Sequence, residues 1–388
     1  MAEVRKNGKE VSCIAFYLPQ FHPIPENDAA WGNGFTEWTN VKRAKPLVTG
    51  HIQPKVPLEG RYYDLRDPRT QEWQARLAQE YGLFGFCYYH YWFQGGKLLL
   101  EKPAEQMLKN ASITLPFCFS WANENWTRKW DGHNQDIIAR QDYGQEQDWE
   151  AHLRYFLSFF RDERYITVDG KPLLLIYKPE EIPCLTEMTQ YWQKRIRQEG
   201  FPGLCLMIQN VNWYFRPDYH PAGFDYQIRF QPFFSMGYRK RKVQVLRTIR
   251  KFRTPIRALH LDVLLRKWQT RRKTTGTEEQ QVLDYDRIWN NLLSAPAEKG
   301  SIECAFTDWD NTPRTTTGYR FEGATPEKFG KYMDALVKKV NQQQRDLPLI
   351  FINAWNEWGE GAYLEPDEQN RFGYLEALKQ ALEGQKLI

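Results

Sequence analysis

The sequence predicts a (β/α)8 barrel on three observations. Short apolar runs alternate with amphipathic helical segments, which is typical of a parallel α/β architecture. Eight such runs can be counted, and aromatic and polar side chains gather after the C-terminal ends of several of them, the face on which barrel enzymes carry their sites. An open doubly wound sheet is the alternative, but it should show a glycine-rich turn after its first strand, and Tyr17-Leu18-Pro19-Gln20 has none.

The predicted strands are short apolar runs, several of them bounded by proline, as expected for strands buried on both faces. The last run begins at Leu347 and changes character within a few residues of its end, where polar side chains appear. The other seven runs span residues 11–18, 84–91, 115–121, 172–177, 203–209, 226–231 and 302–307.

Six helices are expected between and after these strands. The first is the best marked, because Asp67 can cap its N-terminus, Pro68 suits its first position and Gly82 closes it. The expected helices span residues 68–81, 99–110, 145–160, 185–199, 325–343 and 372–382.

Length suits one large domain or two modest ones, and the count of eight strands favours one domain covering residues 1–388. The 388 residues include 41% hydrophobic side chains, which is enough for a substantial core. No apolar run approaches the roughly 20 residues needed to cross a bilayer, and no signal-like segment follows Met1, so a cytoplasmic protein is expected. The six cysteines are scattered without metal-ligand spacing, and we expect buried free thiols.

One segment departs from this pattern. Residues 239–273 hold fourteen Lys or Arg and one acidic residue, a balance of +13, and because the chain carries +5 the remainder carries −8. The charge therefore belongs to an insertion, residues 237–282, between the sixth and seventh strands. Interleaved Leu and Ile favour an amphipathic helical element that contacts an anionic membrane surface, although a solvated basic face is the alternative. Nucleic acid is not expected as a partner.

The polar residues after the last run are the strongest candidates for chemistry. Asn356, Glu357 and Glu360 follow the strand among Trp358 and other aromatic residues. Two carboxylates three residues apart can share acid and base roles, and aromatic faces suit sugar rings. Surface glutamates at a strand end are the alternative.

Further candidates for saccharide binding follow the other strands. Glu37 and Glu124 either bind hydroxyls or pair with basic side chains, and His22 and His90 are expected in hydrogen bonds rather than on a metal. The tryptophans stack on sugars or cap the core. The set is Tyr17, His22, Glu37, Trp38, Tyr89, His90, Trp92, Asn123, Glu124, Trp126, Asp308, Trp309, Asn356 and Trp358.

Five motifs together resemble the WbsX-like proteins, which are related to glycoside hydrolase family 99. The likeness covers nearly the whole chain outside the basic insertion, and as a set the motifs are specific. They are residues 15–22 (AFYLPQFH), 34–38 (GFTEW), 85–92 (GFCYYHYW), 121–126 (WANENW) and 356–361 (NEWGEG). The resemblance implies a (β/α)8 barrel and a role in bacterial O-antigen, lipopolysaccharide or other surface polysaccharide metabolism.

Family 99 enzymes are retaining endo-α-mannosidases, and the resemblance implies roles for two glutamates. Glu357 would remove the proton of the sugar 2-hydroxyl so that O2 attacks C1, and Glu360 would protonate the leaving oxygen and later activate water. This 1,2-anhydro route differs from the usual attack by a carboxylate. Gly359 departs from the family, which commonly has His there, so mannose specificity does not follow from the motif.

Two other functions compete with hydrolysis. Asp308-Trp309-Asp310 resembles the metal-binding DxD pair of glycosyltransferases, but no glycine-rich phosphate-binding turn accompanies it. A saccharide-binding barrel without activity is the second. We expect no cofactor and no metal.

Overall fold

A computed structural model of the protein describes residues 2–8, 10–128, 133–210, 223–237, 280–315, 317–343 and 345–387. The basic segment 239–273, and with it most of the expected insertion 237–282, lies outside the described residues. No helix in the described ranges is long and apolar enough to cross a membrane. All six cysteines fall within these ranges, and each is a free thiol.

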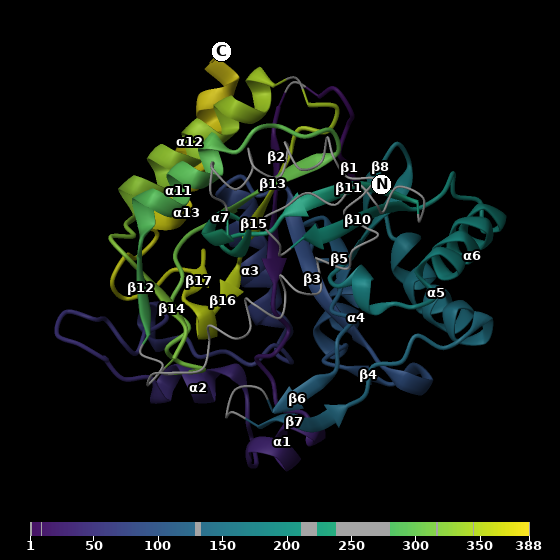
Figure 1. Ribbon diagram of the computed structural model, residues 1–388, viewed down its shortest axis with the longest axis horizontal. Coiled ribbons are helices and arrows are strands. Elements are labelled where there is room, and N and C mark those ends of the chain that lie inside the picture. The colour runs from purple at the N-terminus through teal and green to yellow at the C-terminus, as the bar shows by residue number, and fades with distance from the viewer. Residues whose placement is uncertain are drawn as a thin grey trace, which may run out of the picture.

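Eight parallel strands close into a barrel (Figure 1), which confirms the predicted fold class. Each strand pairs with the next one along the chain, and the last pairs with the first through Ile350 and Cys13. The barrel strands are β2 (Ser12–Tyr17), β3 (Gly85–Trp92), β5 (Phe117–Trp121), β9 (Lys171–Ile176), β10 (Cys205–Asn210), β11 (Phe224–Arg229), β13 (Ser301–Phe306) and β15 (Leu349–Asn353).

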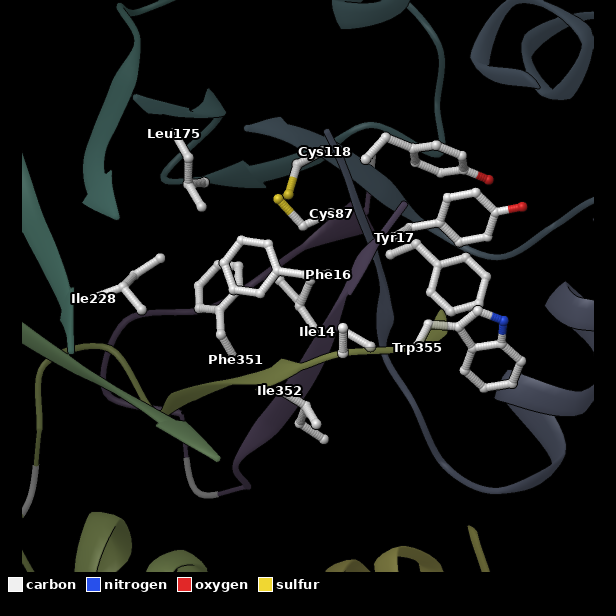
Figure 2. Close-up of a cluster of buried hydrophobic side chains, with 14 of the residues drawn as sticks. Ile14, Phe16, Tyr17, Cys87, Cys118, Leu175, Ile228, Phe351, Ile352 and Trp355 are labelled. Carbon is white, nitrogen blue, oxygen red and sulfur yellow. The ribbon is translucent and has the colours of Figure 1, made fainter. Parts of the chain in front are cut away.

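Side chains of successive residues alternate between the inside of the barrel and the surrounding helices. The ring of Phe16 lies 5.3 Å from that of Phe351 and 5.3 Å from that of Phe230, measured between centroids. Figure 2 shows Phe16 and Phe351 pointing away from Tyr17 and Trp355, which lie on the outer side. Both faces of these strands are buried, which explains their continuous apolar sequence.

Helices cover the outside of the barrel, with α5 and α6 on one side and α11 to α13 on the other (Figure 1). The six expected helices are present with bounds within a few residues of the prediction. They are α3 (Pro68–Glu80), α4 (Lys102–Lys109), α5 (Glu146–Phe160), α6 (Leu185–Gln198), α12 (Pro326–Gln342) and α13 (Gly373–Glu383). As predicted, Asp67 caps α3 by accepting a hydrogen bond from the backbone of Arg69 at 3.0 Å.

Several further elements were not expected from the sequence. Helix α11 (Tyr285–Ser294) packs on the barrel, and the short helices α1 (Pro25–Trp31), α2 (Glu37–Arg43) and α7 (Phe233–Gly237) lie in loops. Small sheets also extend the loops: β6 (Trp126–Arg128) pairs with β7 (His133–Ala139), β12 (Gln281–Asp284) with β14 (Tyr319–Glu322), and β16 (Asn356–Glu357) with β17 (Ala362–Tyr363). Three minor strands, β1 (Ala2–Glu3), β4 (Leu98–Leu99) and β8 (Ile166–Val168), complete the described sheets, and β8 pairs antiparallel with β9.

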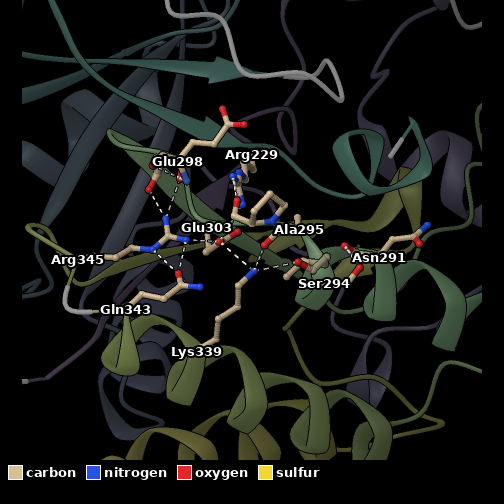
Figure 3. Close-up of polar contacts among 12 residues, drawn as sticks. Arg229, Asn291, Ser294, Ala295, Glu298, Glu303, Lys339, Gln343 and Arg345 are labelled. Carbon is tan, nitrogen blue, oxygen red and sulfur yellow. Dashed lines mark hydrogen bonds and ion pairs between the residues drawn. The ribbon is translucent and has the colours of Figure 1, made fainter. Parts of the chain in front are cut away.

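A buried carboxylate joins β13 to the helices outside it. Arg345, Arg229 and Lys339 approach Oε1 of Glu303 at 2.5, 3.2 and 3.3 Å (Figure 3). Burial opposes ionisation of Glu303, but Arg229 and the other cations bring its pKa below the usual value. Lys339 also donates to the carbonyls of Leu292 and Ala295, so this network fixes the end of α11 against the barrel.

Candidate active site

A cavity of about 400 Å³ opens at the C-terminal ends of the barrel strands. This is the face on which barrel active sites lie. Carboxylates, one guanidinium, amides and aromatic rings make up its wall. The lining residues are Leu18, Gln20, Tyr89, Tyr91, Ala122, Glu124, Asn125, Trp126, Thr127, Tyr177, Phe230, Phe233, Asn311, Arg314, Thr315, Glu357 and Glu360.

Glu357 and Glu360 both line this cavity. Glu357 ends the short strand β16, and Glu360 ends the single helical turn η7 (Trp358–Glu360) that follows it. The Glu357 side chain is 9% exposed and that of Glu360 is 24% exposed. The sequence-predicted pair is therefore brought to one cavity, with one carboxylate deeper than the other.

Arg314 links the pair to a third glutamate. Its Nη2 lies 3.0 Å from Oε2 of Glu357, its Nη1 lies 2.7 Å from Oε1 of Glu360, and its Nε lies 2.8 Å from Oε1 of Glu37. Glu37 begins α2 and its side chain is fully buried. One planar guanidinium thus contacts three carboxylates that come from two distant parts of the chain.

This arrangement makes the protonation of Glu357 unusual. Burial raises the pKa of Glu357 to about 8, Arg314 opposes the rise, and Glu360 and Glu37 add to it. A carboxyl with that pKa carries a proton at neutral pH. The site therefore holds a carboxylic acid beside a second glutamate, and paired acid and base catalysis needs two such groups with different protonation.

Gly359 leaves the space that the three-way contact needs. A Cβ atom at this position would lie 2.0 Å from Oε1 of Glu37 and 2.8 Å from Nε of Arg314. No side chain fits between the pair of catalytic candidates while Glu37 and Arg314 hold their places. Gly359, which departs from the family 99 pattern, thus provides the space that the contact between Glu37 and Arg314 needs.

Asn356 and Trp358 hold the turn from behind instead of lining the cavity. Asn356 accepts a hydrogen bond from the backbone of Leu18 at 2.7 Å and donates one back at 3.0 Å. Trp358 stacks on Tyr363 with ring centroids 3.7 Å apart. These contacts fix the backbone on which Glu357 and Glu360 stand.

The opposite wall carries three of the predicted binding residues, Tyr89, Glu124 and Trp126. Tyr89 accepts a hydrogen bond from Gln209 at 3.0 Å, and the ring of Trp126 stands perpendicular to that of Tyr91 at 4.8 Å. Glu124 forms an ion pair with Lys178. Asn123, just behind the wall, holds the backbone of Lys178 through hydrogen bonds of 2.7 and 2.8 Å.

Other predicted binding residues lie away from the cavity. His90 and Trp92 point to the outer side of β3, where Nε2 of His90 lies 2.9 Å from Nε2 of His152 and Trp92 stacks on the same ring. Burial lowers the pKa of His90 to about 3, so it is neutral. Tyr17 also points outward and donates to Gln74 at 2.7 Å.

His22 and Trp38 are core residues near the loop that carries Glu37. Nδ1 of His22 lies 3.0 Å from the carbonyl of Pro19, and burial lowers the pKa of this imidazole to about 4. Trp38 donates to the carbonyl of Tyr63 at 2.8 Å and packs on Trp358. Both side chains lie in the core behind the cavity and support the segment that carries Glu37.

The side chains of the DxD-like segment, Asp308-Trp309-Asp310, make their contacts within the chain. Asp308 pairs with Lys55 at 2.7 Å. Asp310 lies 2.8 Å from His51 and accepts from Gln53 at 2.6 Å, while Trp309 is buried. Across the described ranges, no group of three or more His, Cys, Asp or Glu side chains could hold a metal. These aspartates fix the loop after β13 and do not line the cavity.

Comparison with known proteins identifies the family of this chain. Residues 13–378 match the family described as Glycosyltransferase WbsX. The chain belongs to this family. It is 39% identical over 375 residues to "Uncharacterized protein WxcX" of Xanthomonas campestris pv. campestris, covering 95% of this chain and 49% of the relative, and equally similar to that protein of a second strain. The chain thus spans about half the length of the curated relatives it matches.

Two solved structures share the fold of this WbsX family member. The family 99 endo-α-mannosidase of Bacteroides thetaiotaomicron is 13% identical with a TM-score of 0.55 and covers 97% of each chain. A protein described as glycoside hydrolase-like is 12% identical with a TM-score of 0.55, covering 97% of this chain and 95% of that one. The likeness is one of barrel architecture.

Sequence reasoning about this WbsX family member missed several lining residues, above all Arg314. The residue lies in the polar loop that follows Asp308-Trp309-Asp310, and an isolated arginine in a loop gives no periodic signal. Tyr91 was part of a quoted motif but was not singled out, although it lies two residues from Tyr89 and so on the same face of β3. Tyr177, which directly follows β9, could have been found by its position alone.

Proposed function

We propose that the protein is a glycoside hydrolase that cleaves a saccharide bound in the cavity above the barrel, with Glu357 and Glu360 as the acid and base pair. The observation that carries this proposal is the pair itself: two carboxylates open on one cavity, and the deeper one is protonated at neutral pH. The aromatic wall opposite, with Tyr89, Tyr91 and Trp126, suits the apolar faces of sugar rings.

The chemistry we propose proceeds in two balanced steps. Glu357 takes the proton of the 2-hydroxyl as O2 bonds to C1, the bond from C1 to the leaving oxygen breaks, and Glu360 gives that oxygen a proton. Glu360 then takes a proton from water as the water oxygen bonds to C1, the bond between C1 and O2 breaks, and Glu357 returns its proton to O2. Configuration at C1 is retained because C1 is attacked twice.

The protonation of the free site bears on these roles. In the first step Glu357 must be ionised, whereas its pKa of about 8 leaves it protonated at pH 7. Whichever glutamate is the base, the reacting form carries one proton on the pair, so kcat/KM should follow a bell-shaped pH profile that falls as this proton is lost above about pH 8. The assignment of Glu357 as the base therefore rests on the family resemblance, and the protonated form of Glu357 in the free site favours the opposite assignment.

The substrate we propose is a bacterial surface polysaccharide or its lipid-linked precursor, cut at an internal bond that is α-mannosidic in the family 99 pattern. The WbsX family and the shared barrel architecture support the saccharide class. A panel of surface polysaccharides of known structure, incubated with the protein and followed by mass spectrometry of released oligosaccharides, tests this substrate class.

The test of the catalytic pair uses conservative variants. Glu357→Gln and Glu360→Gln should each lower kcat by about 10²-fold or more, since positioned acid and base groups contribute roughly 10²–10⁴. Glu376→Gln, an exposed glutamate on α13, is the matched control and should keep wild-type kcat. A fall of less than about tenfold in both site variants refutes the pair. Unchanged oligosaccharide affinity without any turnover of the wild type would indicate a binding protein.

Glycosyl transfer is the second candidate, and the description of the family favours it. The same two steps give transfer when a sugar hydroxyl replaces water at C1. Products formed with added acceptor oligosaccharide distinguish the two, because transfer lengthens the acceptor while hydrolysis yields a free reducing end. Dependence on a divalent metal abolished by Asp308→Ala would favour the metal-dependent route.

We also propose peripheral contact with an anionic membrane on the cytoplasmic side, from the +13 charge of residues 239–273 alone. Each basic residue near an anionic leaflet contributes about 1 kcal/mol. The protein should sediment with anionic vesicles and be released by salt. Equal sedimentation with neutral vesicles, or binding that survives deletion of this segment, contradicts the proposal.

A further inference from the structure

The position of Arg314 is explained neither by the fold nor by the proposed chemistry. Its guanidinium lines the cavity, yet each of its three nitrogens contacts a carboxylate: Glu37, Glu357 or Glu360. Glu37 does not line the cavity and approaches Arg314 from the buried side. The arrangement is thus a fully buried anchor, Glu37, and a reacting pair, Glu357 and Glu360, held around one cation.

The loop that carries Arg314 is itself held firmly. Asp310 accepts hydrogen bonds from the backbone and hydroxyl of Thr312 at 3.0 and 2.5 Å, and it is fixed in turn by His51 and Gln53. The backbone nitrogen of Arg314 donates to the carbonyl of Asn311 at 3.0 Å. The guanidinium is therefore placed by a preformed turn, as a preorganised catalytic site requires.

The negative charges of the three glutamates also require a cation between them. Three carboxylates in a small, mostly buried volume would repel one another and would each tend to bind a proton. One guanidinium offsets part of this repulsion. Because its donors form a rigid planar fork, it also fixes the angle between the carboxylates it contacts.

We infer that Arg314 is a positioning residue for the catalytic pair: anchored by Glu37, it sets the geometry of Glu357 and Glu360 and offsets the repulsion between their carboxylates. The role assigned to the pair rests on the proposed function. The geometry and the protonation of Glu357 and Glu360 are properties of the free protein, so the effect of Arg314 on them can be tested without a substrate. Gly359 belongs to the same unit, since only a residue without Cβ leaves room for the anchor.

The first experiment follows protonation by infrared spectroscopy of the free protein. The wild-type spectrum minus that of Glu357→Gln isolates the carbonyl stretch of protonated Glu357, and Glu365, also buried, cancels in the difference. The band should be present at pH 7 and be lost as pH rises. The charged and titratable groups that face the pair are Arg314, Glu37, Glu124, Tyr89, Tyr91 and Tyr177.

Neutralising Arg314 should move that titration upwards. In an Arg314→Gln background, the midpoint for loss of the Glu357 band should rise by about one pH unit or more, because an opposite charge at this distance shifts a carboxyl by 1–3 units. Arg314→Lys keeps the charge and should leave the midpoint near the wild-type value. An unshifted midpoint in Arg314→Gln overturns the inference.

The second experiment separates geometry from charge by activity. On a saccharide that the wild type cleaves, Arg314→Lys should lower kcat by about tenfold or more with little change in KM, because lysine cannot reach three carboxylates in one plane. Arg314→Gly should regain activity when guanidinium ion is added, while ammonium ion should not restore it. Wild-type kcat in Arg314→Lys contradicts the positioning role.

A further variant covers the case in which the Arg314 substitutions fail to fold. Glu37→Gln leaves Arg314 and both catalytic candidates in place and removes only the anchoring charge. It should lower kcat and alter the pH profile of kcat/KM, and an unchanged rate and profile overturn the anchor. If the wild type cleaves no saccharide, the proposed function fails, while the infrared titration still decides the role of Arg314.

Discussion

Nε1 of Trp358 donates a hydrogen bond of 2.6 Å to Oε2 of Glu365. The same carboxylate accepts from Tyr63 at 2.8 Å and from Gln74 at 2.6 Å, and Gln74 lies on α3 outside the barrel. The turn that carries Glu357 and Glu360 is thus tied to the outer helices through a buried carboxylate. The rigidity of the site depends on a residue that never touches the cavity.

Removing this carboxylate should destabilise the protein. In Glu365→Ala, three buried donors lose their acceptor, and since each costs about 1–3 kcal/mol, we expect the free energy of unfolding to fall by about 3 kcal/mol or more. Urea denaturation measures the change. Glu376→Ala, at an exposed site on α13, should change it by no more than about 0.5 kcal/mol. Equal losses in the two variants would show that the Glu365 contacts contribute nothing.

Glu357→Gln should make the protein more stable while abolishing activity. The pKa of Glu357 is raised in the folded protein, so its favourable contribution is present below the unfolded pKa and is lost as pH rises through about 8. The glutamine variant does not suffer that loss. Its Tm advantage over wild type should therefore grow between pH 5 and pH 8, to at least about 2 °C.

The control for this stability experiment is Glu376→Gln, at an exposed site on α13, measured over the same pH range. Glu365, whose pKa burial raises to about 7, is present in both proteins and cancels. A Tm difference for Glu357→Gln that is the same at pH 5 and pH 8 would show that Glu357 titrates alike in the folded and unfolded chain.

Gly359→Ala should reduce activity more than stability. The added Cβ would lie 2.0 Å from the Glu37 carboxylate, so the contact between Glu37 and Arg314 must open. We expect kcat to fall by about tenfold or more. Gly384→Ala, where the nearest atom is 3.8 Å away, is the control. In a Glu37→Ala background the effect of Gly359→Ala should shrink, because the colliding group is gone; additive effects would contradict the steric reason.

The stereochemistry of cleavage tests the 1,2-anhydro route. The first-formed product should keep the anomeric configuration of the substrate, as followed by NMR during the first turnovers. A substrate that lacks the 2-hydroxyl at the cleaved residue should not react, since O2 supplies the attacking atom. Inversion, or normal cleavage of the 2-deoxy analogue, rules this route out.

The barrel could be predicted because each of its elements is marked by residues that are neighbours in the sequence. Each strand is a short apolar run buried on both faces, and Asp67, Pro68 and Gly82 mark a helix without reference to the rest of the chain. Helix α11 was missed although Tyr285, Ile288, Trp289 and Leu292 are buried at helical spacing; it begins directly after the expected insertion, in a stretch that was assigned no element.

The site was predictable in part for the same reason. Glu357 and Glu360 are close in sequence, so their convergence follows from local geometry. The contacts of Glu37 and Arg314 span 277 positions and depend on how loops pack. Alternation along β3 also separates Tyr89 and Tyr91 from His90 and Trp92, and a motif quoted as a block conceals which face each residue occupies.

Closure of the barrel between β2 and β15 has a consequence for synthesis of the protein. During translation, Glu37 leaves the ribosome early, whereas Glu357 and Glu360 are among the last residues of the barrel to emerge. Until then the cation and its anchor have no reacting partners, and β2 has no neighbour on one edge. Under the proposed function, a nascent chain therefore cannot cleave a saccharide before the final strand is in place.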